Sequence, residues 1–102
     1  MGIEIAVVRS DGSKVQSVED PTNILHRILP VHDDTRYHYL NRIDWYGDTT
    51  FNRHQIHYFN EELQRLMKDI ERQDQKALLN QISAFAMLCE AEPHLYLKFI
   101  GD

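Results

Sequence analysis

Two apolar stripes in the second half of the chain constrain its fold more than any other feature. At about 100° per residue, apolar positions spaced three and four apart share one side of a helix. The first stripe predicts a helix running to about Arg72, and the second predicts a helix from near Asp74 to Glu92, which Pro93 ends. The stripes are Ile56, Phe59, Leu63, Leu66 and Ile70, and then Leu78, Ile82, Phe85 and Cys89.

The start of the first long helix is marked at Asn52. As an N-cap, Asn52 has Gln55 three residues on, which is the spacing of a capping box. Phe51 and Ile56 occupy the two positions of a hydrophobic staple. Both devices therefore predict the same helix start.

Alternating residues at the two ends of the chain predict a sheet. Ile3, Ile5 and Val7 alternate with smaller or charged residues, and a glycine turn at 10–13 leads into a second strand at 14–18. The C-terminal segment 94–102 alternates again and predicts a further strand. The predicted class is α+β, a small antiparallel sheet of this hairpin and the C-terminal strand, covered by two long antiparallel helices.

A short extra helix is predicted between Asp20 and Leu29. Asp20 offers an acceptor at the cap, Pro21 has a suitable fixed φ at the first helical position, and Pro30 stops the helix near Leu29. Residues 31–44 carry no clear period, so we expect irregular backbone with some extended structure there.

Composition and charge favour one domain, residues 1–102, in an acidic cytoplasmic protein. The apolar fraction of 42% and the charged fraction of 26% are ordinary for a soluble chain. There are 16 acids against 11 bases, a net charge of −5, and no run of basic residues, which argues against nucleic acid as a partner. We also expect no membrane segment and no signal peptide, because the apolar runs are too short.

The segment D-W-Y-G-D-T-T-F-N, residues 44–52, is read first as a turn that leads into the Asn52 cap. Gly47 allows a positive φ, and the Asp48 carboxylate can accept from nearby amides. Adjacent aromatics in an extended segment point to opposite sides, so only one of Trp45 and Tyr46 can enter the core. The segment is therefore also the predicted rim of a binding surface, whose candidate residues are Asp44, Trp45, Tyr46, Asp48, Arg53 and Asp102.

Metal binding and catalysis have weaker support. His54, His57 and Glu61 share one helical side, but that side points away from the apolar stripe and no fourth ligand accompanies it, so we predict no metal and no cofactor. Cys89 lies on an apolar stripe, where a thiol is inert. The remaining route to catalysis is a convergence of the carboxylates of Asp44, Asp48 and Asp102.

The segment Tyr46-Gly47-Asp48-Thr49, followed by two long helices and a C-terminal Phe99-Ile100-Gly101-Asp102, resembles a family of small uncharacterised bacterial proteins common in actinobacteria. That family has a Y-G-D-T segment and an F-I-G-D ending. The resemblance implies a cytoplasmic single domain without an assigned activity. It also implies that the two Gly-Asp pairs lie together in space.

These features favour a small cytoplasmic protein-binding module over an enzyme. Its most concrete form is an immunity protein or another inhibitor, with a toxin or another enzyme as its partner. The alternative is a small enzyme or ligand-binding protein that uses the acidic and aromatic surface around Asp44 and Asp48. The sequence leaves the oligomeric state open.

Overall fold

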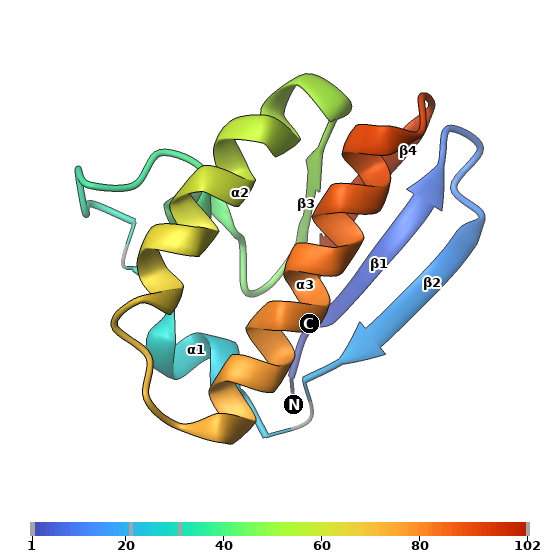
Figure 1. Ribbon diagram of the computed structural model, residues 1–102. Coiled ribbons are helices and arrows are strands. Elements are labelled where there is room, and N and C mark those ends of the chain that lie inside the picture. Colours follow the sequence, from blue (N-terminus) through green and yellow to red (C-terminus); the bar gives the residue numbers. More distant parts are fainter. Residues whose placement is uncertain (1, 21, 31, 102) are drawn as a thin grey trace.

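The computed structural model describes residues 2–20, 22–30 and 32–101 and confirms the α+β class. Its strands form one antiparallel sheet in the order β2-β1-β4-β3. Figure 1 shows the long helices α2 and α3 in front of this sheet. The strands are β1 (Glu4–Arg9), β2 (Lys14–Glu19), β3 (Asp48–Phe51) and β4 (Leu95–Ile100), and the helices are α1 (Ile24–Ile28), the 3₁₀ helix η1 (Leu40–Arg42), α2 (Arg53–Met67) and α3 (Gln73–Ala91).

The N-terminal hairpin forms as its alternation predicts. Gly12 adopts φ +88° in the turn, and the Asp11 carboxylate accepts from the Ser13 amide at 2.9 Å. Ile5 and Val7 of β1 pair with Phe99 and Leu97 of β4, and all four side chains are buried. These apolar side chains form the sheet side of the core, against which the helices pack.

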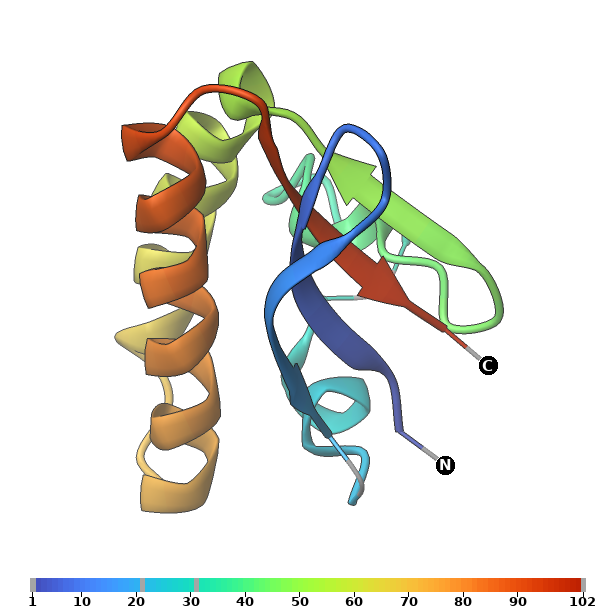
Figure 2. The same ribbon diagram turned by 90° about the vertical axis from the view of Figure 1, so that its right-hand side faces the viewer.

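The long helix α2 begins as predicted and ends five residues earlier than predicted. The Asn52 side chain accepts from the Gln55 amide, and the Gln55 side chain accepts from the Asn52 amide, both at 2.9 Å. The helix ends at Met67 rather than near Arg72, because residues 68–72 reverse the chain direction into α3. Figure 2 shows α2 and α3 on the same side of the sheet.

The short helix α1 begins at Ile24, later than the prediction from Asp20. Asp20 is buried, and its carboxylate accepts from the amides of Ile24 and Leu25 at 2.9 and 2.8 Å. It therefore caps the helix from four residues upstream, across a left-handed Asn23 with φ 58°. Pro21 lies outside the described residues, and the stop at Leu29 agrees with the prediction.

The described segment 32–43 is irregular, as predicted, and contains no strand. Extended backbone occurs there at single positions such as Ile43, with φ −64° and ψ 122°. The segment carries the single turn of η1, and three of its side chains, Tyr37, Leu40 and Ile43, are buried in the core. These three positions are three residues apart, but the run is too short to give the sequence a recognisable helical or strand period. Position 31 lies outside the described residues.

The strand β3 corrects the prediction of a turn at Asp44 to Asn52. Thr49 pairs with Phe99 and Phe51 with Leu97, so β3 adds an edge strand beside β4. The C-terminal strand is consequently central in the sheet rather than at its edge. Residues 44–47 remain a turn, and the strand runs directly from that turn to the Asn52 cap.

The sheet face opposite α2 and α3 is covered by its own long side chains. Ala6 and Val8 are buried on this face. Lys14 reaches Glu4 at 2.8 Å, although the register places the two residues at opposite ends of the hairpin. The two side chains extend toward each other along this face, and the Lys14 side chain stays 49% exposed.

No helix in the described ranges combines the length and the apolar character that crossing a membrane requires.

Candidate functional site

The turn at residues 44–47, here called the Tyr46 loop, is fixed by short hydrogen bonds. The Asp44 amide donates to the Thr49 hydroxyl at 2.9 Å, and the Tyr46 amide donates to the Asp44 carboxylate at 2.9 Å. The Gly101 amide donates to the Gly47 carbonyl at 2.8 Å and ties the loop to the end of β4. These three hydrogen bonds fix the backbone of the loop. Tyr46, which the loop carries, is 83% exposed.

As predicted, one of the two adjacent aromatics, Trp45 and Tyr46, packs against the core and the other is exposed. Trp45 is half-buried against the core and meets the His26 ring edge-on, with 4.9 Å between ring centroids. Trp45 is therefore a packing residue in the first place. Tyr46 remains as the exposed aromatic of the pair.

Gly47 does not adopt a positive φ, so that part of the prediction is wrong. Its role is spatial, because a Cβ there would lie 2.8 Å from Asp44 Oδ2. Gly101 is tighter still, since its Cβ would lie 2.6 Å from the Gly47 carbonyl oxygen. The two glycines of the Gly-Asp pairs thus meet in space, while Asp102 lies outside the described residues.

The carboxylates of Asp44 and Asp48 have separate contacts. Asp44 accepts from the Tyr46 amide within the loop. Asp48 lies on the helix-free face of the sheet, 3.4 Å from Lys98 Nζ, and does not fold onto nearby amides as predicted. Among the described residues these contacts give no proton-sharing pair of acids.

Arg53 lies at the far end of β3 from the Tyr46 loop. It is the first residue of α2, and its Nε donates to the Glu90 carbonyl at 3.0 Å, near the end of α3. The predicted binding set is therefore divided between the two ends of β3. Arg53 belongs to a different surface.

That second surface is here called the Tyr58 surface and consists of Tyr39, Arg42, Arg53, His54, His57 and Tyr58. Tyr58 is 47% exposed and stacks on Tyr39, with ring centroids 6.2 Å apart and an angle of 13° between planes. The Arg42 guanidinium lies 5.0 Å from the Tyr39 ring centroid. Beside the stack is an open depression of about 510 Å³ lined by Arg53, His54, His57, Tyr58 and Glu90.

The Tyr58 surface is anchored in the core. Tyr39 contacts Phe51 edge-on at 6.3 Å, and Phe51 contacts Phe59 at 4.9 Å. This row of rings leads from fully buried side chains to the exposed Tyr58. The sequence does not predict this row, because Tyr39 and Arg42 come from the segment without a pattern.

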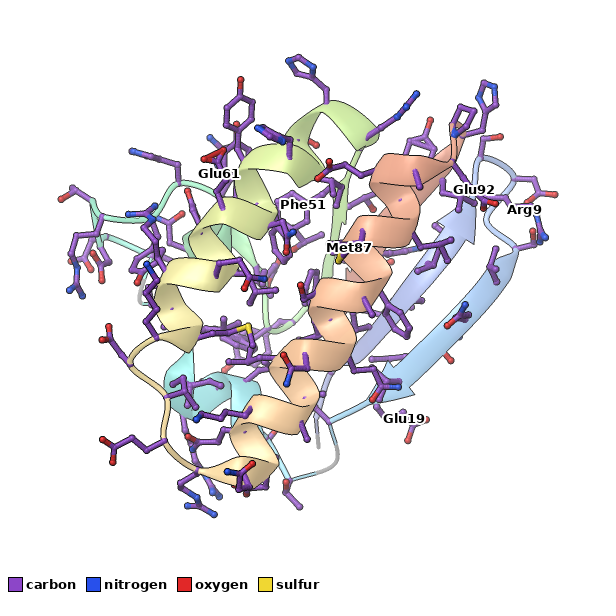
Figure 3. All side chains as sticks on the ribbon, in the orientation of Figure 1. Arg9, Glu19, Phe51, Glu61, Met87 and Glu92 are labelled. Atoms are coloured by element: carbon purple, nitrogen blue, oxygen red, sulfur yellow. The ribbon has the colours of Figure 1, made fainter. Side chains whose placement is uncertain are left out.

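The predicted set of His54, His57 and Glu61 is exposed on α2, on the side predicted. His57 Nε2 lies 3.3 Å from Glu61, and its Nδ1 lies 3.9 Å from Glu90, so the two carboxylates approach opposite nitrogens of one ring. Figure 3 shows Glu61 at the outer side of α2. Within the described ranges no three histidine, cysteine or acidic side chains are grouped as a metal site requires.

Glu62 is a further structural residue that was not among the predicted site residues. It is 4% exposed on α2, and its carboxylate accepts three backbone hydrogen bonds from residues 38–40. The signal was present, because Glu62 lies three residues after Phe59 and four before Leu66 on the apolar stripe. An acid at such a position requires buried donors.

Comparison with protein-family models, with curated proteins and with solved structures found no match to the chain. The resemblance to the Y-G-D-T family therefore stays a prediction.

Proposed function

We propose that this protein is a small cytoplasmic binding module that contacts another protein through the Tyr58 surface. One observation carries the proposal: an exposed tyrosine is stacked on a second tyrosine beneath an arginine, at the end of a row of core aromatics. Tyrosine and arginine are enriched among the residues that dominate binding energy at protein interfaces.

The rigidity of the Tyr58 surface supports this use. Tyr58 is on a helix and its ring is stacked, so little side-chain freedom is lost when a partner covers it. Arg53 is likewise held by its hydrogen bond to the Glu90 carbonyl. The surface is already ordered before any partner arrives.

The most concrete form of the proposal is an immunity protein or another inhibitor of a partner enzyme, of bacterial origin. The small size, the net charge of −5 and the resemblance motivate this form. A toxin or nuclease gene beside the gene for this chain would support the inhibitor form, and a metabolic operon would count against it.

The test is capture of partners from a lysate of the source organism on immobilised wild-type protein and on Tyr58→Ala. Tyr58 is half exposed and alanine favours helix, so the variant should keep its fold. We expect the captured partner to bind Tyr58→Ala about tenfold more weakly or worse, because truncating a central aromatic removes a dominant contact. Titration calorimetry with the purified partner gives the dissociation constants.

Met87→Ala is the matched control, since Met87 is 61% exposed on the neighbouring helix and lies outside the Tyr58 surface. It should bind as the wild type does. Tyr46→Ala tests the other exposed aromatic. Equal binding by wild type and Tyr58→Ala, or a loss confined to Tyr46→Ala, would overturn the assignment of the surface.

We do not propose catalysis or small-ligand binding at Asp44 and Asp48, the alternative from the sequence. The contacts of Asp44 with a loop amide and of Asp48 with Lys98 favour no such role.

A further inference from the structure

Glu62 joins the long helix α2 to a segment more than twenty residues earlier in the chain. Its Oε2 accepts from the His38 amide at 2.8 Å. Its Oε1 accepts from the amides of Tyr39 and Leu40 at 3.0 and 3.1 Å. Three consecutive backbone donors therefore converge on one carboxylate that is 4% exposed.

This arrangement determines where the side chains of residues 39 and 40 point. Leu40 enters the core and is 2% exposed. Tyr39 instead lies between Phe51 and Tyr58 and forms the second ring of the exposed stack. Other contacts hold the parts of this segment on either side, among them the Asn41 side chain on the carbonyls of His32 and Asp34. The amides of residues 38–40 themselves donate to Glu62, so the placement of Tyr39 follows from the backbone that Glu62 holds.

We propose that Glu62 is the positioning residue of the Tyr58 surface, holding Tyr39 under Tyr58 through the backbone of residues 38–40. The consequence for partner binding rests on the proposed function, whereas the positioning itself does not. Glu62 is buried and acts through Tyr39.

The chemistry of the contact explains why glutamate is needed there. A carboxylate offers acceptors on both oxygens, and hydrogen bonds to a charged acceptor are stronger than neutral ones. A glutamine of the same shape would keep one carbonyl oxygen but turn an NH₂ group toward at least one backbone donor. A buried donor left without an acceptor favours local opening of its segment.

The test compares Glu62→Gln with Glu61→Gln by NMR in the absence of any partner. Glu61 is the neighbouring exposed glutamate on α2 and contacts His57, so its variant controls for loss of one negative charge. In Glu62→Gln we expect amide hydrogen exchange of Tyr39 and Leu40 to speed up about tenfold or more. We also expect the ring-current shifts of the Tyr58 ring protons to shrink, while Glu61→Gln leaves the amide exchange of Tyr39 and Leu40 unchanged.

Unchanged Tyr58 ring shifts in a folded Glu62→Gln variant would overturn the proposal, even if its melting temperature fell. A purely structural role would lower stability without moving the rings. Glu62→Asp is the second variant, because it keeps the charge on a shorter side chain. Its ring shifts should lie between those of wild type and Glu62→Gln, and a variant indistinguishable from Glu62→Gln would contradict the need for the carboxylate.

If neither variant folds, amide exchange of the wild-type protein decides the question. The amides of residues 38–40 should then exchange slowly and with the same opening free energy, as expected for one cooperative unit. Fast exchange with different rates at the three amides would overturn the proposal. None of these measurements involves a partner. Failure here is therefore distinguishable from failure of the proposed function, which the Tyr58→Ala capture experiment tests.

Discussion

Gly101 shows at the scale of one residue how closely the end of β4 approaches the Tyr46 loop. A Cβ at this position would lie 2.6 Å from the Gly47 oxygen and 2.7 Å from the Trp45 carbonyl carbon and oxygen. These are backbone atoms, which cannot rotate away. We expect Gly101→Ala to lower the free energy of unfolding by about 1 to 3 kcal/mol, measured by urea denaturation.

Gly47→Ala is the comparison for that prediction. The nearest atom to a Cβ at position 47 is Asp44 Oδ2, the end of a side chain, at 2.8 Å. This carboxylate can move aside at the expense of its bond to the Tyr46 amide. The loss should therefore be smaller than for Gly101→Ala, and equal losses would contradict the distinction between backbone and side-chain neighbours.

Asp48 offers the second prediction at residue scale. Its contact with Lys98 is a surface ion pair, with side chains 52% and 30% exposed. Such pairs contribute about 0 to 1 kcal/mol, so Asp48→Asn should hardly change the melting temperature. Since Asp48 lies outside the Tyr58 surface, partner affinity should also stay unchanged, and a large loss of affinity with normal stability would place the binding surface at the Tyr46 loop instead.

At the scale of elements, α2 and α3 depend on the stripes that bury them against the sheet. Leu63 is 1% exposed in the middle of the α2 stripe. We expect Leu63→Ala to lower the free energy of unfolding by about 2 to 5 kcal/mol, a large part of the stability of so small a chain. The measurement is chemical denaturation, with Met87→Ala as an exposed control that should change stability by about 0.5 kcal/mol or less.

At the scale of the whole molecule, the protonation and reactivity of the buried Cys89 thiol measure how well the core excludes water. Burial raises the pKa of its thiol from 9.0 to about 11. The folded state holds this proton more tightly than the unfolded chain, so the thiol contributes stability below pH 9 that is lost as the pH rises from 9 toward 11.

The same burial predicts an unreactive thiol at pH 8. Reaction of Cys89 with an aromatic disulfide reagent should be slower in the folded protein than in denaturant by a factor on the order of a hundred or more. The absorbance of the released thiol measures the rate. Comparable rates in both conditions would mean that the core around α3 opens readily.

The elements that the sequence predicted well are those whose signal is local. The Asn52 cap requires only residues 51–56, and the apolar stripes of α2 and α3 repeat within a few turns. The hairpin and the C-terminal strand alternate within six residues each. Each of these patterns is complete within one element, so the α+β class followed from it.

The candidate site was predicted in part, through residues that are adjacent in sequence. One of Trp45 and Tyr46 was predicted to enter the core, and Trp45 does so, although the two lie in a turn rather than in an extended segment. The exposure of His54 and His57 follows from the helical period. The positions of Asp48 and Arg53 could not be predicted from such local patterns. Both positions depend on β3, which forms because β4 offers it a free edge.

The sequence by itself thus determined the two long helices, the hairpin, the last strand and the buried thiol, because local periodicity encodes which side of an element is apolar. Only the tertiary structure decided that Glu62 would bind the amides of residues 38–40 and that Tyr39 would stack on Tyr58. These contacts join residues about twenty positions apart, in a segment without a period. Their physical basis is the need of buried backbone donors for an acceptor, which appears only after the helix and the loop have been brought together.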